Sequence, residues 1–147
     1  MTPSIRRAIS TDLATLVDLH RQFCVVDGHP FNEARATAAF GPLLEDDRWG
    51  VVWIFDDSAG YAVVVWGWSI EAGGFEAVLD EIFVVRRGEG TGAALIEHVL
   101  AQGRTSGLAR IFLETESRND RVRPFYARHG FTTDDSIWMS YEYVDLT

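Results

Sequence analysis

Three glycines fall within five residues in the run Arg87–Gly92, which reads RGEGTG. The apolar residues 78–85 before it predict a strand, and residues 93–102 after it have the spacing of an amphipathic helix. Glycine allows positive φ and a close approach of the backbone to a ligand. A strand, a glycine turn and a helix start direct unpaired backbone amides and the positive end of the helix dipole at one point. With Arg86 and Arg87 beside it, this point is suited to a pyrophosphate.

The size and charge of the chain limit what it can do. Its 147 residues suffice for one domain with a real core, but not for two ordinary domains. The formal net charge of −9 argues against general nucleic-acid binding and attracts a cationic substrate more readily than an anionic one. No apolar run approaches the length of a membrane span and the first residues lack a signal core, so we expect a cytoplasmic protein without a membrane partner.

The order of the expected elements is that of a mixed α/β protein. Thr11 is expected to cap the first helix and Asn32 the second. The order predicts a mixed central sheet of about six to seven strands flanked by about four helices, of the α+β type, with antiparallel hairpins early and one strand–helix–strand crossover. The expected strands are residues 5–9, 50–55, 61–69, 78–85, 110–114, 131–133 and 137–143, and the expected helices are residues 12–25, 32–44, 93–102 and 119–128.

Two motifs resemble those of the GNAT superfamily of N-acetyltransferases. The run Arg87–Gly92 matches the acetyl-CoA signature Arg/Gln-x-x-Gly-x-Gly/Ala and continues into a small, apolar helix start at Ala93. The run Asn119–Phe131 resembles the family's Asn-x-x-Ala-x-x-Phe-Tyr-x-x-x-Gly-Phe, with Val122 in place of alanine. The resemblance implies a single GNAT-like domain over residues 1–147, an N-acetyltransferase that uses acetyl-CoA. Because many members of that family are dimers, a homodimer is one expectation, although no interface is visible in the sequence.

The resemblance also implies which residues hold the cofactor. The pyrophosphate would lie against the amides of Gly88–Gly92 with Arg87 as charge partner, and the pantetheine arm would pair with the backbone of Val84 and Val85. A backbone amide near Val84 would donate to the oxyanion. Asn119 would hydrogen-bond the arm or cap a helix. The expected cofactor residues are Val84, Val85, Arg87, Gly88, Glu89, Gly90, Thr91, Gly92, Ala93, Asn119 and Tyr126.

Acetyl transfer to an amine needs a group that removes a proton, because a primary amine is mostly protonated at neutral pH. Asp80 and Glu81 lie among apolar neighbours on the strand before the glycine run. Adjacent strand residues point to opposite faces, so only one of the two would face a given cleft; we favour Glu81, with Asp80 as the near alternative. The resemblance assigns Tyr126 as the general acid for the leaving thiolate. Each residue also has a purely structural alternative: the carboxylate would pair with a neighbouring strand, and Tyr126 would pack in the core beside Phe125.

The acceptor is expected to be a small molecule with a primary amine that attacks directly in a ternary complex. Aromatic side chains would line its cleft, since the face of a tryptophan ring attracts cations, and the alternative is that they belong to the core. His20 and Cys24 have a spacing that suits metal ligands, but with no further ligand nearby no metal is expected. The candidate acceptor residues are Trp68, Glu71, Tyr61, Trp138 and His29, together with Trp66.

Other functions are compatible with parts of the sequence. The glycine run also satisfies the dinucleotide-binding pattern Gly-x-Gly-x-x-Ala, and Glu114 lies where a ribose-binding acid would be. Too few residues follow Glu114 to complete a doubly wound sheet, which argues against an oxidoreductase. A non-catalytic acetyl-CoA sensor and an enzyme that acetylates a protein amine are the remaining alternatives.

Overall fold

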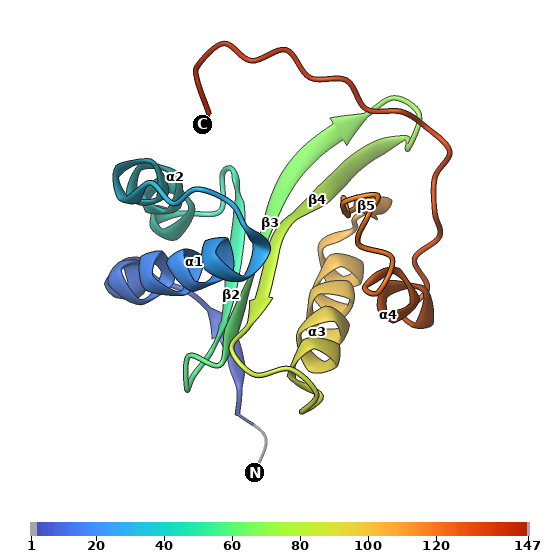
Figure 1. Ribbon diagram of the computed structural model, residues 1–147. Helices are drawn as coiled ribbons and strands as arrows, with labels where there is room; N and C mark the ends of the chain where they lie inside the picture. The colour runs from blue at the N-terminus through green and yellow to red at the C-terminus, as the bar shows by residue number, and fades with distance from the viewer. Residues whose placement is uncertain (1–2, 147) are drawn as a thin grey trace. The chain divides into compact units, whose positions relative to one another are not determined.

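A five-stranded mixed sheet holds together the first part of the chain, up to Glu114 (Figure 1). The computed structural model describes residues 3–146. Strands β1 to β4 pair antiparallel in sequence order, and β5 lies parallel to β4 at the edge. The five strands expected in this part of the chain are present, with β4 longer than expected at its start. Their bounds are β1 Ile5–Arg7, β2 Gly50–Phe55, β3 Gly60–Ser69, β4 Gly74–Val84 and β5 Arg110–Phe112.

Helices cover both faces of this sheet. The helices α1 (Leu13–Asp27) and α2 (Glu33–Glu45) lie on one face, and α3 (Thr91–Ser106) lies on the other (Figure 1). Full burial of one large apolar side chain stabilises the fold by roughly 1.5–3 kcal/mol. Within residues 3–146, no helix has the length and apolar character needed to cross a bilayer. The core under α1 and α2 includes Leu16, Leu19, Phe40, Leu44, Val52, Ile54, Tyr61 and Val63.

The starts of the first two helices differ in how well the sequence predicts them. Asn32 caps α2 as expected, since its side-chain oxygen accepts a hydrogen bond from the Arg35 amide at 2.9 Å. Thr11 does not cap α1, because it lies inside the short 3-10 helix η1 (Ser10–Asp12) that precedes it. The extra turn moves the start of α1 to Leu13.

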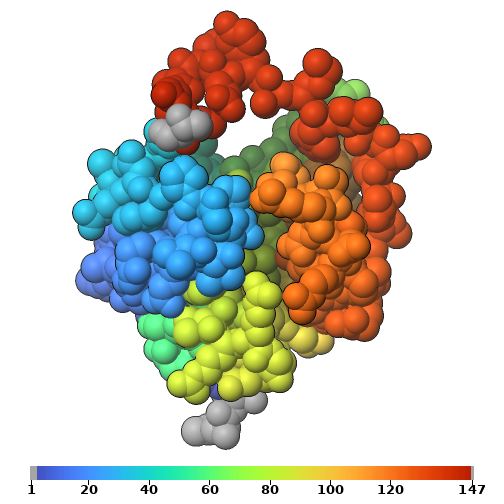
Figure 2. Space-filling model, in the orientation of Figure 1, coloured from blue at the N-terminus to red at the C-terminus, as the bar shows by residue number. Residues whose placement is uncertain are grey.

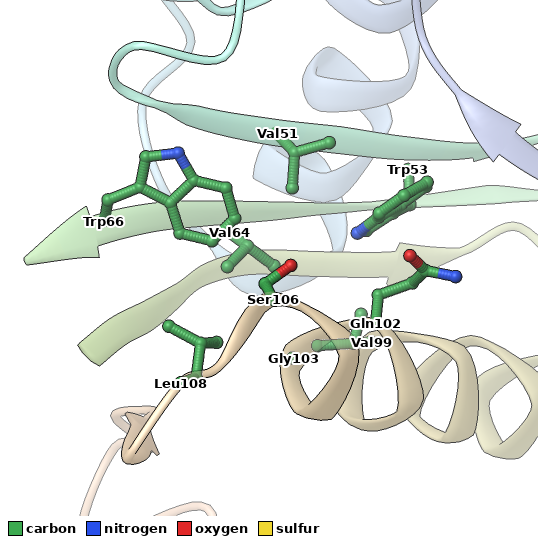
Figure 3. A pocket seen from close by; sticks show the side chains of 9 residues that line it. All are labelled: Val51, Trp53, Val64, Trp66, Val99, Gln102, Gly103, Ser106 and Leu108. Carbon is green, nitrogen blue, oxygen red and sulfur yellow. The ribbon is translucent and has the colours of Figure 1, made fainter. Parts of the chain in front are cut away.

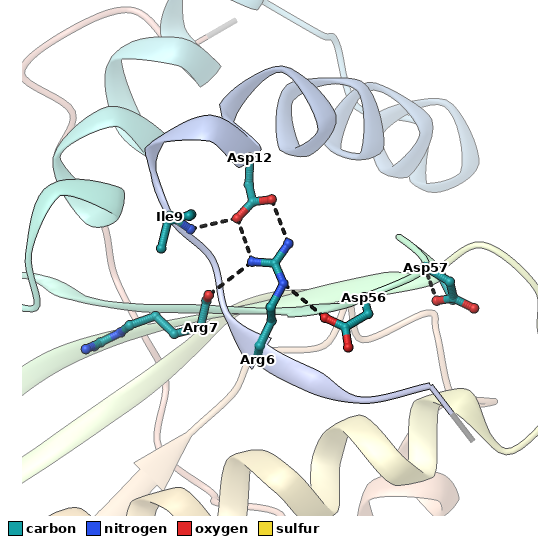
Figure 4. Close-up of polar contacts among 7 residues, drawn as sticks. Arg6, Arg7, Ile9, Asp12, Asp56 and Asp57 are labelled. Carbon is teal, nitrogen blue, oxygen red and sulfur yellow. Dashed lines mark hydrogen bonds and ion pairs between the residues drawn. The ribbon is translucent and has the colours of Figure 1, made fainter. Parts of the chain in front are cut away.

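Arg6, on the edge strand β1, holds the chain in place before the start of α1. The Arg6 guanidinium binds both carboxylate oxygens of Asp12, at 2.8 and 2.9 Å, and Nε donates to Asp56 at 3.0 Å (Figure 4). The same Asp12 carboxylate accepts the Ile9 amide at 2.7 Å. The hydrogen bonds from Arg6 hold the pKa of Asp12 below its usual value. The contacts therefore tie β1 to η1 and to the turn between β2 and β3.

The second unit, from Thr115 on, contains less regular structure than expected. Its described residues form one helix, α4 (Arg123–Arg128). The helix begins later than expected because Pro124 suits the first turn of a helix, so Asn119 is not its cap. The expected strands 131–133 and 137–143 are absent, because the described residues of that segment form no strand. The sheet therefore has five strands instead of the expected six to seven, while the four expected helices are confirmed.

Candidate functional site

The glycine run forms a turn that leaves the start of α3 open. Gly88 and Gly90 have φ of +80° and +76°, a left-handed conformation that glycine adopts without steric cost. Gly90 is the N-cap of α3 and offers no side chain to its first amides, and the first turn contains no acidic residue. The Ala94 amide donates back to the Gly90 carbonyl at 3.1 Å. The amides that precede Ala94 in the helix lack intrahelical partners, which makes the start of α3 suited to an anion. Residues 85–90, which lead to this start, are exposed on the surface (yellow-green in Figure 2).

Strand β4 has an open edge just before this turn. Strand β5 pairs with β4 only at residues 76–78, so residues 79–84 are not paired with β5. The Val85 amide donates to the Ala59 carbonyl at 2.8 Å, on the β3 side. Alternate residues of an antiparallel strand direct their N–H groups to alternate sides, so the Val84 amide points to the open edge. This orientation fits the oxyanion donor expected near Val84, whereas the amide of Val85 is already engaged and does not fit the expected pairing with the cofactor arm.

A β-bulge in β4 falls at the two expected carboxylates. Val63 lies opposite Glu81 and Val64 lies opposite Leu79, which leaves Asp80 without a partner on β3. An extra residue of this kind interrupts the strict alternation of side chains. The strict alternation on which the choice between the two carboxylates was based therefore does not hold at Asp80 and Glu81.

Glu81 is fixed by a hydrogen bond from the core. The Tyr61 hydroxyl donates to Glu81 Oε1 at 2.5 Å. Tyr61 is completely buried, and its ring packs against Phe40 and Phe83. Burial, with the nearby charge of Glu81, raises the pKa of Tyr61, so its hydroxyl stays protonated and remains a donor. Tyr61 is therefore a core residue that positions Glu81, and not part of an acceptor cleft.

His20 on α1 binds the same carboxylate. Its Nδ1 lies 2.8 Å from Glu81 Oε1, and its Nε2 lies 3.4 Å from the Cys24 sulfur. Cys24 is buried, which raises the pKa of its thiol and keeps it protonated. In the sequence, His20 is a candidate only as a metal ligand, and its contact with Glu81 could not be predicted, because the two partners are 61 positions apart and no local spacing links them. Among the described residues, no group of three or more His, Cys, Asp or Glu side chains is arranged to hold a metal ion.

Asp80 is the carboxylate that remains open to solvent. It is exposed and has no hydrogen-bond partner within residues 3–146. Even so, the surrounding protein partly desolvates the Asp80 carboxylate, and this desolvation raises its pKa. The negative charge of Glu81 raises the pKa of Asp80 further, whereas His20 lowers it. A carboxylate with a raised pKa is a better proton acceptor at neutral pH than an ordinary one.

Two of the expected acceptor residues lie far from these carboxylates. Trp68 is on β3, five positions beyond the Val63 that faces Glu81 (63 to 68), which is roughly 17 Å along a strand. Glu71 follows in the turn and forms an ion pair with Arg110 at 3.2 Å. The structure therefore does not bring Trp68 and Glu71 together with the carboxylate pair.

The other expected acceptor residues have separate contacts. His29, after α1, pairs with Asp27 at 2.7 Å, and its ring stacks on Phe23. Trp66 donates from its indole nitrogen to the carbonyl of Asp47 at 2.8 Å. Trp138 is an exposed residue of the second unit.

Tyr126 lies on α4 in the second unit. Its ring packs against Phe125 and Phe131, and 9% of the residue is exposed. Burial raises the pKa of Tyr126, so its hydroxyl is protonated at neutral pH, as a general acid must be. Tyr126 does pack beside Phe125, which was the alternative to a catalytic role. This packing is compatible with a hydroxyl that donates a proton. Asn119 lies before α4, where its backbone amide donates to the Glu116 carbonyl at 2.9 Å.

A small cavity between α3 and the sheet is not a substrate site. Its volume of about 20 Å³ holds one water molecule, and no carboxylate lines it (Figure 3). Glu81 contacts His20 and Tyr61, which belong with the core under α1, on the other face of the sheet. The cavity is lined by Val51, Trp53, Val64, Trp66, Val99, Gln102, Gly103, Ser106 and Leu108.

Comparison with known proteins identifies the family. A model of the acetyltransferase (GNAT) family matches residues 14–131 of the chain. The integron cassette protein HFX_CASS3, from the mobile metagenome of Cole Harbour Salt Marsh, is 28% identical, with 96% of this chain and 91% of that chain covered and a TM-score of 0.85. No curated protein matches the chain.

Two more distant crystal structures share the fold. A predicted acetyltransferase from Clostridium acetobutylicum, solved with acetyl-CoA, is 18% identical, with 96% of each chain covered and a TM-score of 0.78. The aminoglycoside acetyltransferase meta-AAC0020, from an uncultured soil metagenomic sample and in complex with sisomicin, is 16% identical, with 97% of this chain and 96% of that chain covered and a TM-score of 0.78. The family match, over most of the chain, includes both the glycine turn and the Tyr126 motif. The chain therefore belongs to the GNAT family of acetyltransferases and is an N-acetyltransferase that uses acetyl-CoA.

Proposed function

We propose that this enzyme transfers the acetyl group to the primary amine of a small molecule, by direct attack in a ternary complex. The observation that carries the proposal is the bulge in β4, which presents Asp80 and Glu81 on the strand that leads into the glycine turn. The net charge of −9 and the two carboxylates favour an acceptor that arrives as a cation. An aminoglycoside acetyltransferase with the same fold gives a precedent for a small-molecule acceptor.

The glycine turn and the open edge of β4 fit the two ends of acetyl-CoA. The amides at the start of α3, with Arg86 and Arg87 nearby, suit the diphosphate. Acetyl-CoA supplies the thioester whose carbonyl carbon the amine attacks and whose thiolate leaves. The Val84 amide donates to the carbonyl oxygen as it gains charge, an effect commonly worth about 3 kcal/mol.

The proton of the amine goes to Asp80, directly or through a water molecule. Asp80 is exposed and has a raised pKa, whereas Oε1 of Glu81 already accepts from Tyr61 and lies within hydrogen-bond distance of His20. Glu81 is therefore a positioning residue that adds negative charge beside Asp80. On these contacts we rank Asp80 above Glu81 as the proton acceptor, the reverse of the order favoured from the sequence.

Direct attack on the thioester is favoured over a covalent enzyme intermediate. The single cysteine, Cys24, is buried, and the raised pKa of its thiol leaves little thiolate to act as a nucleophile. Because the amine itself is then the nucleophile, kinetics should show a ternary complex and no acetyl-enzyme.

Replacing Tyr126 by phenylalanine is expected to lower kcat by roughly 100-fold, because the leaving thiolate loses its proton donor. Affinity for acetyl-CoA, measured by calorimetry, should stay close to that of the wild type. The matched control is Tyr143→Phe, since Tyr143 is 92% exposed and its loss of a hydroxyl should change neither quantity. An unchanged kcat in Tyr126→Phe would remove this residue from the reaction.

The substrate class is tested by thiol release from acetyl-CoA with a panel of acceptors. Turnover with small primary amines and not with peptides supports the proposal. Turnover only with lysine-containing or N-terminal peptides would show a protein acceptor instead. Acetyl-CoA binding without turnover on any amine would support the sensor.

A further inference from the structure

A histidine interrupts the apolar row by which α1 packs on the sheet. Leu16, His20 and Cys24 are spaced four residues apart, which places their side chains in one row along the helix. Leu16 and Cys24 are buried. The His20 side chain, in the same row, is 20% exposed. A polar ring in this position costs free energy unless its nitrogens are hydrogen-bonded, so its partners indicate what it does.

Both ring nitrogens of His20 have a partner. Nδ1 lies 2.8 Å from Oε1 of Glu81, and Nε2 lies 3.4 Å from the sulfur of Cys24. An ionised carboxylate only accepts hydrogen bonds, so Nδ1 carries a hydrogen. Burial, with the charges of Glu81 and Asp27, raises the pKa of Cys24, and a protonated thiol can donate to Nε2 or accept from it. His20 can therefore be neutral or cationic in this position, and in both states it donates to Glu81.

Aromatic rings shield this contact from water. The His20 ring packs against Phe23 of the same helix, against Phe31 and against Phe40 of α2, with ring centroids 6.1, 5.9 and 6.1 Å apart. The Glu81 side chain is 19% exposed. Charges that are partly removed from water are screened much less than exposed ones. The interaction of His20 with the carboxylates of β4 is therefore stronger than an ion pair on the surface.

The groups around Asp80 act on it in opposite directions. The charge of the adjacent Glu81 favours the protonated form of Asp80, whereas His20 favours the ionised form. Tyr61 on β3 and Cys24 on α1 carry no charge, because both have a raised pKa. The balance between Glu81 on β4 and His20 on α1 therefore controls how readily Asp80 gives up its proton.

We propose that His20 is a positioning residue for the acetyl transfer, which compensates the charge of Glu81 from α1 and so extends toward acid pH the range in which Asp80 takes the proton of the amine. This inference rests on the proposed role of Asp80. Without His20, the charge of Glu81 is uncompensated and Asp80 keeps its own proton up to a higher pH. An Asp80 that is already protonated cannot accept a proton from the amine.

The first test follows the proton of Asp80 directly, by carbon-13 NMR titration of the aspartate carboxyl groups in the full chain. The signal is assigned by its loss in Asp80→Asn. His20→Leu, which completes the apolar row, and His20→Phe, which keeps an aromatic ring, should each move the titration midpoint of Asp80 to higher pH. Glu81→Gln should move it to lower pH. An unchanged midpoint in a folded His20 variant, or shifts of one sign in the His20 and Glu81 variants, would overturn the proposal.

The matched control is His98→Phe. His98 is a partly buried histidine of α3, on the other face of the sheet, and its ring packs against Trp53 with centroids 4.5 Å apart. Its loss should leave the titration midpoint of Asp80 unchanged. A shift as large as that in His20→Phe would trace the effect to a general change in the fold, against the proposal.

The second test is the pH dependence of kcat/KM with acetyl-CoA and the small primary amine that turns over fastest in the acceptor panel. On the acidic limb, kcat/KM of His20→Leu should be about tenfold lower than that of the wild type, and the difference should shrink toward high pH. The same amine is used throughout, so its own ionisation contributes equally.

The two tests separate this inference from the proposed function. A midpoint that shifts in His20→Leu without a shift of the acidic limb would overturn the role of Asp80 as proton acceptor, although the pairing on which it depends would be real. A midpoint that does not shift would overturn the role of His20 and leave the proposed function as it stands.

Discussion

Gly90→Leu is expected to weaken acetyl-CoA binding by about 100-fold or more, equivalent to about 2.7 kcal/mol of binding free energy. Gly90 has a φ of +76° and caps α3, and an added Cβ would meet no atom within 4 Å among the described residues beyond its neighbours in the chain. The fold therefore has room for the side chain, but the space that it enters is the approach to the first amides of α3. A residue with a Cβ also disfavours the left-handed conformation that aims these amides. Isothermal titration calorimetry with acetyl-CoA gives the affinity.

The matched control is Gly107→Leu at the other end of the same helix. Gly107 has a φ of +80°, is the C-cap of α3, and likewise has nothing within 4 Å of an added Cβ. Both substitutions should lower the free energy of unfolding by about 1–2 kcal/mol through the same backbone strain. Only Gly90→Leu should lose the cofactor. Equal loss of affinity in the two variants would trace the effect to helix stability, and normal binding by Gly90→Leu would mean that the diphosphate lies elsewhere.

Asp80→Asn is expected to lower kcat by about 100- to 1,000-fold with little change in the KM for acetyl-CoA, because the amine loses its proton acceptor. The same variant should be more stable than the wild type at neutral pH. Since the surrounding protein partly desolvates the Asp80 carboxylate and raises its pKa, the folded state holds this proton more tightly than the unfolded state, and stability falls as pH rises from the unfolded-state pKa through the folded-state pKa. The difference in Tm between variant and wild type should therefore grow from acid to neutral pH.

Two other variants test this assignment. Glu97→Gln, at an exposed carboxylate on α3, should leave kcat and the pH profile of Tm unchanged. Glu81→Gln should lower kcat less than Asp80→Asn, because it disturbs contacts with Tyr61 and His20 but keeps the proton acceptor. A larger loss in Glu81→Gln than in Asp80→Asn would exchange the two roles.

Local patterns in the sequence predicted the frame of the candidate site. The strand before the glycine run and the helix after it are present as expected, although β4 begins four residues earlier and α3 extends beyond both expected ends. Asn32 caps α2, because a cap depends on near neighbours in the chain. The bulge at Asp80 could not be predicted, since it depends on the register of β4 against β3. The contact of His20 with Glu81 likewise joins residues on separate elements.

The absent C-terminal strands show a different limit. Alternation at residues 137–143 predicts a strand, but a strand forms only where a neighbouring edge receives it. The sequence shows the alternation of the segment itself, but not whether a sheet edge is available to pair with it.

The start of α4 could have been predicted more accurately from Pro124. Proline prefers the first turn of a helix, which would have moved the predicted start of α4 past Asn119.

The bulge in β4 has a consequence for how this enzyme can change. One unpaired residue interrupts the ladder between two central strands, so a shortened chain without position 80 would have a more regular sheet. Such a deletion would leave the fold intact while removing the group that receives the proton. Selection for a more stable protein would then oppose selection for a more active one. Catalysis would depend on keeping the bulge in β4.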